Sequence, residues 1–97
     1  MLRATSEVQL DTERVRVTEW CFCPGAATGW HTHEYDYIVV PLTTGALRLD
    51  EADGSRTVQL EQGKSYARAA SVQHDVVNPN AFEFRFVEIE LKPPPSR

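Results

Sequence analysis

The strongest constraint on the fold of this chain is an alternation of apolar and polar residues with a period of two. The alternation is clean in Arg14–Thr18, Ala46–Asp50, Thr57–Glu61 and Phe82–Phe86, and it continues, shifted by one residue, in Val87–Leu91. Such alternation predicts β-strands with one face toward a core and one face toward water. The shift at Phe86-Val87 indicates either a bulge or a strand with both faces partly covered. No window of a dozen residues shows a helical stripe.

Turn signals separate these runs at short, regular intervals. The Asp53-Gly54 pair between two alternating runs is the clearest hairpin, because both residues tolerate the positive φ of a tight turn. Many short strands with a turn every eight to twelve residues predict an all-β fold, an antiparallel sandwich or barrel. The turn signals are Pro24-Gly25, Thr43-Thr44-Gly45, Asp53-Gly54, Gln62-Gly63 and Asn78-Pro79-Asn80.

Length and charge limit the domain organisation and the partners. A chain of 97 residues predicts one domain, divided into an N-terminal strand or arm over 1–12, a β-barrel over 13–91 and a flexible proline-rich tail over 92–97. The net charge of −4 argues against nucleic acid or an anionic membrane as partner. The first residues lack the apolar run of a signal peptide, and we therefore expect a cytoplasmic protein. Cys21 and Cys23 are expected to be reduced, half-buried thiols.

Two of the three histidines lie one residue apart in the stretch GWHTHEYDY, which spans 29–37. On a strand, His31 and His33 would point to the same face, roughly 7 Å apart, and could approach one metal ion together. A third ligand would then have to come from another strand, and His74 in the strand-like stretch 71–78 is the remaining histidine. The alternative is that His31 and His33 are two polar residues on an exposed strand.

The spacing around these histidines resembles that of the cupin superfamily. Gly25, five residues, His31, one residue and His33 match the start of the first cupin motif, and Gly63, ten residues, His74, three residues and Asn78 match the second. The resemblance covers about residues 13–91 and implies a single-domain barrel of jelly-roll type, also called a double-stranded β-helix or RmlC-like fold. It also implies a divalent metal, with all three histidines at the ligand positions of the family. The stretch EYDYIVVPLTTG is similar to small cupins associated with β-alanine degradation.

The chain departs from the family pattern at the carboxylate ligand. Cupins usually have a glutamate three or four residues after the second histidine, where this chain has Tyr37 and Ile38. Asp36, or less readily Glu34, could replace it, although strand parity would turn Asp36 away from the histidines. We expect a three-histidine site, with Asp36 as an additional or outer ligand. The site is expected to bind Fe, Mn, Ni or Zn. In the second motif, Ala69 and Ser71 replace the usual proline and glycine.

Residues of the same parity would surround the predicted metal site. Tyr35 and Tyr37 are expected to line a pocket and to orient a polar ligand, although each could equally be a core aromatic residue. Trp20, Trp30 and Tyr66 are expected to serve in packing. Asn78 is expected to cap the turn into Pro79, and the orientation of Glu19 and Glu88 is left open.

These features favour a metal-dependent enzyme acting on a small organic acid or carbonyl compound. With Fe(II) the chemistry would resemble that of a dioxygenase, and with another metal it would be Lewis-acid catalysis, as in an isomerase. Two alternatives are a cupin that binds a small ligand without catalysis and a structural protein with a vestigial site. The strand over 82–91 is apolar on both faces, which predicts a homodimer.

Overall fold

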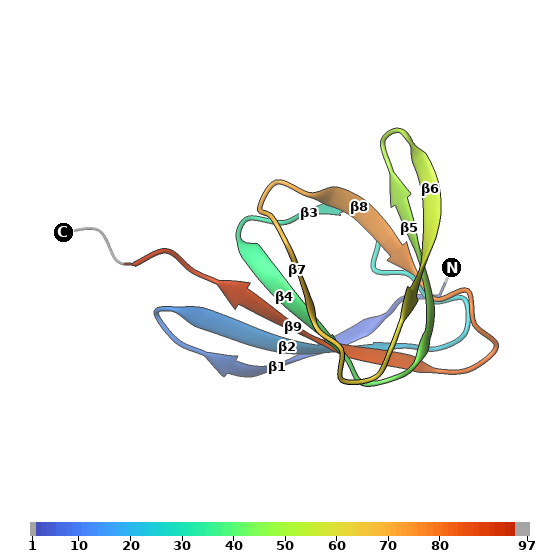
Figure 1. Cartoon of the computed structure of the whole chain (residues 1–97), viewed down its shortest axis with the longest axis horizontal. Coiled ribbons are helices and arrows are strands. Elements are labelled where there is room, and N and C mark those ends of the chain that lie inside the picture. The colour runs from blue at the N-terminus through green and yellow to red at the C-terminus, as the bar shows by residue number, and fades with distance from the viewer. Residues whose placement is uncertain (1, 95–97) are drawn as a thin grey trace.

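The computed structural model describes residues 2–94, and every regular element in that range is a strand. The predicted all-β fold is confirmed (Figure 1). No helix among the described residues is long and apolar enough to cross a membrane. The strands are β1 (Thr5–Asp11), β2 (Val15–Phe22), β3 (His31–Thr32), β4 (Asp36–Pro41), β5 (Gly45–Glu51), β6 (Gly54–Leu60), β7 (Tyr66–Arg68), β8 (Gln73–Val77) and β9 (Phe84–Leu91).

The strands form two antiparallel sheets that face each other. The first has five strands in the order β1-β2-β9-β4-β7, and the second has four in the order β3-β8-β5-β6. Figure 1 shows the second sheet standing over one end of the first, so that the two curve around a shared interior. The β5–β6 hairpin turns within one residue of the predicted position. Glu51 pairs with Gly54, so residues 52–53 form the loop, and of the predicted pair only Gly54 has a positive φ, of 131°.

The predicted N-terminal strand is part of the five-stranded sheet, since β1 pairs with β2 along its length. At the other end, the backbone N–H of Lys92 donates to the carbonyl of Arg14 at 2.8 Å, and the Lys92 ammonium contacts Asp11. The predicted flexible tail is described only as far as Pro94. Met1 and residues 95–97 lie outside the described part of the chain.

The central strand β9 does not contain the bulge suggested by the sequence. Its pairing with β2 and with β4 runs without a register shift, and the shift lies instead in β1, between Val8 and Leu10. The apolar residues switch from one face to the other because the inward face of β9 meets the core in its first half and a cavity in its second half. Phe84 and Phe86 face the core, whereas Glu88 and Glu90 continue the same inward face into a cavity.

The hydrophobic core occupies one end of the interior. Phe22 and Phe84 are fully buried and lie opposite each other in the β2–β9 ladder, and Leu47 reaches them from β5 in the other sheet. Burying two phenylalanines and a leucine contributes roughly 2 kcal/mol per side chain. The remaining buried members of this cluster are Ala26, Tyr37, Val39, Leu49, Val76 and Phe86.

Asn78 is a fully buried polar residue at the closed end of the core. Its side-chain amide donates to the carbonyls of Phe22 at 3.1 Å and Phe82 at 2.8 Å, and its Oδ1 accepts from the backbone N–H of Asn80 at 2.8 Å. Asn78 thus caps the turn into Pro79, as expected from the sequence. It also ties β2 to the segment that leads into β9.

Part of the outer face of the five-stranded sheet is apolar. Leu10, Val17, Ile89 and Ile38 form a row across four strands, each opposite the next in the ladders. No other strand of the described chain packs on this face (Figure 1). Further apolar residues of the outer face are Val15, Val40, Val87 and Leu91.

Asn78→Ala should lower the free energy of unfolding by about 3 kcal/mol, because it removes from a fully buried position the side chain that bonds the carbonyls of Phe22 and Phe82 and the N–H of Asn80. Chemical denaturation monitored by circular dichroism measures this loss. Gln59→Ala, a truncation of an exposed residue on β6, is the control and should change stability by less than about 0.5 kcal/mol. A loss below about 1 kcal/mol for Asn78→Ala would show that this amide does not tie the strands together.

Candidate metal centre

The three histidines meet where β3 and β8 pair at the edge of the four-stranded sheet. His31 is the first residue of β3 and lies directly opposite His74 in the ladder with β8. His33 follows one residue after β3 ends. Its backbone N–H donates to the carbonyl of Val72, and its own carbonyl accepts from Ser71. These bonds hold His33 beside the segment that leads into β8, so that its ring joins the other two.

The connection from β7 into β8 contains one strained residue. Ser71 has a φ of 75°, a backbone conformation that glycine adopts more easily than serine. Ser71 occupies the position where the second cupin motif usually has glycine. The serine therefore keeps the loop geometry of the motif, at a cost of order 1 kcal/mol.

The imidazole Nε2 atoms converge on one point. Nε2 of His33 is 3.0 Å from Nε2 of His31 and 3.0 Å from Nε2 of His74. One ligand atom from each histidine lies within 4.8 Å of the others, a cluster that could hold a metal ion. Two nitrogen ligands about 2.1 Å from a single ion and at right angles would also be about 3.0 Å apart. The spacing therefore fits adjacent coordination positions on one ion.

Hydrogen bonding fixes the proton of His31 on the nitrogen that faces away from the cluster. Nδ1 of His31 is 2.8 Å from the carbonyl oxygen of Gly29, which can only accept, so Nδ1 must carry the proton. Nε2 then presents a lone pair to the centre. Gly29 has a φ of 88°, and its N–H donates to Oδ1 of Asp75 at 3.0 Å, which holds the loop in place.

Burial keeps the other two histidines neutral. Desolvation, with a smaller contribution from His31, lowers the pKa of His33 to about 4 and that of His74 to about 3. Three neutral imidazoles cannot satisfy one another, because His31 Nε2 carries no proton and His33 Nε2 has at most one to donate to two neighbours. A divalent cation would satisfy all three lone pairs. The residues present therefore fit a transition-metal ion.

Tyr37 and Glu88 flank His33. The Tyr37 ring stacks on the imidazole with ring centroids 3.9 Å apart, and its buried hydroxyl has no hydrogen-bond partner within residues 2–94. Burial raises the pKa of Tyr37 well above its usual value, so the hydroxyl remains a donor. Oε1 of Glu88 is 3.9 Å from His33 Nδ1, and burial raises the pKa of this carboxyl to about 7.

A cavity of about 300 Å³ opens beside the histidines, between the two sheets. Its inner end is apolar, with Val39, Leu47 and Phe86. Its outer end carries most of the charged side chains. The other lining residues are Arg16, Trp20, Thr28, His31, Thr32, His33, Glu34, Tyr37, Leu49, Tyr66, Arg68, His74, Val76, Glu88 and Glu90.

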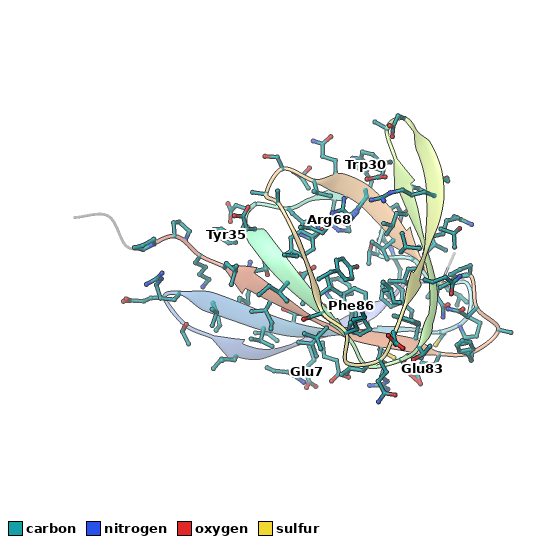
Figure 2. The ribbon with its side chains drawn as sticks, in the orientation of Figure 1. Glu7, Trp30, Tyr35, Arg68, Glu83 and Phe86 are labelled. Carbon is teal, nitrogen blue, oxygen red and sulfur yellow. The ribbon has the colours of Figure 1, made fainter. Side chains whose placement is uncertain are left out.

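Two residues of the predicted site lie elsewhere. Asp36 is exposed at the start of β4, where its Oδ1 accepts from the backbone N–H of Ala70 at 2.7 Å, and it is not part of the histidine cluster. Tyr35 does not line the cavity, and Figure 2 shows it just before the start of β4. The chain bends between β3 and β4, so side chains do not alternate between the two faces from His33 to Tyr35 as they would on one continuous strand. The alternation begins again within β4, where Tyr37 faces inward as expected.

The aromatic residues expected to serve in packing differ in their placement. Trp20 and Tyr66 pack against the core and also line the cavity. Trp30 is 54% exposed, so the expectation that it packs in the interior was wrong. It lies in the loop before β3, where no pleat fixes the direction of its side chain.

The sequence analysis missed Arg16, Arg68 and Glu90 and left the direction of Glu88 open. All four face the cavity. A signal was present, because Glu88 and Glu90 share the parity of Phe84 and Phe86 along one strand. If β9 is taken as one strand without a bulge, the alternation that places Phe84 and Phe86 inward also places both glutamates inward.

Removal of His74 should flatten the pH dependence of stability in the metal-free protein. In the folded state its pKa of about 3 lies below the unfolded value of 6.5, so only the unfolded chain gains a proton as the pH falls. This stabilising contribution is complete above pH 6.5 and is lost progressively below it. Between pH 7.5 and 5, the wild type should lose about 2 kcal/mol more than His74→Gln.

Denaturant titrations at several pH values, with a chelator present, measure this difference. Glu88, whose folded pKa lies above its unfolded value, acts in the opposite direction in both proteins and cancels from the comparison. Parallel stability profiles for the wild type and His74→Gln would contradict a buried, neutral His74.

The chain matches curated and solved proteins over nearly its whole length. It is 50% identical over 90 residues to the β-alanine degradation protein BauB of Pseudomonas aeruginosa, covering 93% of this chain and 95% of that protein. It is 55% identical to a cupin domain from Bordetella pertussis Tohama I of known crystal structure. That match has a TM-score of 0.93 and covers 95% of this chain and 96% of the other.

A more distant structure shares the fold alone. The polyketide cyclase RemF from Streptomyces resistomycificus has a TM-score of 0.75 at 21% identity, covering 97% of this chain and 68% of that one. The family described as the cupin domain matches residues 18–90. The match contains all three histidines and all of the central strand β9 except its last residue, Leu91. The chain is a small, single-domain member of the cupin family.

Proposed function

We propose that this cupin is a metal-dependent enzyme that acts on a small organic acid or carbonyl compound. The observation that carries the proposal is the convergence of three imidazole Nε2 atoms, two pairs of them 3.0 Å apart, beside a cavity of about 300 Å³. His31, His33 and His74 would hold the ion. A divalent ion bound there would act as a Lewis acid or, as Fe(II), would support oxygen chemistry.

The residues around the ion would bind and orient the substrate. The Tyr37 hydroxyl, buried and without a partner in the described chain, is available to donate to a substrate oxygen. The Glu88 carboxyl lies beside His33, where it could take or return a proton at the edge of the cavity. The apolar inner end, with Leu47 and Phe86, would exclude water from the reacting group.

The relative from P. aeruginosa supports a substrate class. Its name assigns it to β-alanine degradation, and it shares half of its residues with this chain over 90 positions. We therefore propose that this chain also acts in β-alanine breakdown, on a compound of comparable size. A cavity of 300 Å³ holds about ten water-sized groups, which suits such a molecule.

Protein purified without a histidine tag and loaded with Fe, Mn, Ni or Zn should retain about one ion per chain. His74→Ala should weaken binding of that ion by at least about 100-fold, because it removes a direct ligand. Mass spectrometry of the metal content and competition with a chelator measure both. Gln73→Ala, an exposed neighbour on β8, is the control and should bind metal as the wild type does.

Failure of the wild type to bind any of the four metals, or unchanged affinity in His74→Ala, would exclude the metal-dependent function. A non-catalytic ligand-binding role is the alternative. It would be favoured if the metal-loaded protein bound small carboxylates but neither consumed oxygen nor formed product in a screen that included β-alanine and its three-carbon derivatives.

We further propose that two copies pair through the apolar outer face of the five-stranded sheet. A two-fold interface uses the same patch on both subunits, and the row of Leu10, Val17, Ile89 and Ile38 carries no charge to repel its own copy. Outside this row, Arg85 pairs with Glu19 at 2.7 Å and with Glu83 at 3.0 Å between their charged atoms.

The wild type should therefore sediment as a dimer at micromolar concentration, and Ile89→Lys should shift it toward the monomer. Thr57→Lys, on the exposed strand β6, adds the same charge elsewhere and should leave the dimer intact. Circular dichroism checks that both variants are folded. A monomeric wild type, or a folded Ile89→Lys that is still dimeric, would rule out this interface.

A further inference from the structure

Four polar side chains form a row across the large sheet, at the outer end of the cavity. Arg16 on β2 pairs with Glu90 on β9, Glu90 pairs with Tyr37 on β4, and Tyr37 pairs with Arg68 on β7. All four line the cavity. The row therefore begins and ends with an arginine and places both guanidinium groups around the same opening.

The two arginines differ in whether their donors have partners. Arg16 forms a two-pronged pair with Glu90, from Nε at 2.8 Å and from Nη2 at 3.1 Å. Arg68 makes no side-chain hydrogen bond to any residue of the described chain. Its shortest ionic contact joins Nη2 to Oε2 of Glu51 at 3.6 Å, beyond hydrogen-bond distance.

Glu51 is also engaged by a second arginine. Its Oε1 accepts from Nε of Arg56 at 2.8 Å, so the carboxylate is directed toward Arg56 rather than Arg68. The Arg68 side chain is only 21% exposed, whereas that of Arg56 is 52% exposed and well hydrated. Arg68 is thus a partly buried guanidinium whose five donors make no hydrogen bond to a side chain of residues 2–94, although none of them is fully sealed from solvent.

The position of Arg68 indicates what would supply the acceptor. It lies beside Tyr37 in the ladder, and Tyr37 stacks on His33 of the histidine cluster. Figure 2 shows Arg68 in the opening between the two sheets, not on the outer surface. A planar carboxylate matches the guanidinium fork with two parallel hydrogen bonds, which an amide or an alcohol cannot do.

We propose that Arg68 anchors the carboxylate of a small organic acid in the cavity and directs the rest of that molecule toward His31, His33 and His74. Arg16 and Glu90 hold each other in a two-pronged pair, whereas Arg68 has only the looser contact with Glu51 at 3.6 Å, so Arg68 is the arginine of the row whose hydrogen bonds an anionic ligand would complete. The placement of the far end of the ligand rests on the proposed metal function, whereas the carboxylate contact itself does not.

The test compares propanoate with its neutral analogue propanamide, by chemical shift changes in NMR titrations of metal-free and Zn-loaded protein. The wild type should bind propanoate at least ten times more tightly than propanamide in both forms. Arg68→Met should lose at least tenfold in propanoate affinity without a change for propanamide. Arg68→Lys should recover only part of the loss, since an ammonium lacks the fork.

Arg56→Met is the matched control, because Arg56 contacts the same Glu51 but does not line this cavity. It should bind propanoate as the wild type does, which separates a loss of anion recognition from a disturbance of Glu51. Equal propanoate affinity in Arg68→Met and the wild type would overturn the proposal, as would an equal loss in Arg56→Met.

The two proposals can fail separately. If no metal binds but propanoate affinity still depends on Arg68, the metal function fails and the carboxylate anchor stands. If metal binds and Zn-loaded Arg68→Met holds propanoate unchanged, the anchor fails and the metal function stands.

Discussion

The uninterrupted register of β9 is the constraint on which both the core and the site depend. Each residue of β9 pairs with β2 on one side, and six of them also pair with β4 on the other. Because no residue is inserted, every second side chain points into the interior from one end of the strand to the other. Phe84 and Phe86 contribute to the core, and Glu88 and Glu90 then line the cavity. A single bulge would have exchanged two glutamates for Val87 and Ile89.

The site combines two different electrostatic environments. On the side of the four-stranded sheet, His33 and His74 are neutral because burial disfavours their charged form and lowers their pKa values. On the side of the five-stranded sheet, Arg16 donates two hydrogen bonds to the carboxylate of Glu90. Neutral nitrogen donors suit a metal ion, and an arginine with unmatched donors suits an anion. The cavity between them accordingly fits a molecule with a carboxylate at one end and a metal-binding group at the other.

Local patterns predicted the all-β fold, and the resemblance to the two cupin motifs predicted the histidine cluster. The period of two identified the strands, and motif spacing placed His74 beside His31 although 42 positions separate them in the chain. The spacing was informative because strand pairing converts it into proximity. The failures have a common cause. Tyr35 and Asp36 follow a bend between two strands, and Trp30 lies in a loop, so strand parity cannot be carried through these residues.

Arg68 could not have been identified from local pattern alone. Its role depends on which acceptors are near it, and Glu51 is a partner only because β5 and β7 come close in the folded chain. The same limit applies to Tyr37, whose stacking on His33 requires a strand and a loop to meet. Contacts between sheets depend on how the two layers pack against each other, and a short sequence motif does not determine that packing.

The histidines and Arg68 belong to opposite layers, and this has a consequence for the lifetime of the protein. The edge strands β6 and β7 are not paired with each other, so the two layers can separate on that side without breaking a ladder. A molecule held by Arg68 on β7 and by the histidines of β3 and β8 would cross-link the two layers. At a concentration 100 times its dissociation constant, it would add about 2.7 kcal/mol to the free energy of unfolding. The intact barrel would then persist longest when such a ligand is abundant, and proteolytic turnover would rise as the ligand became scarce.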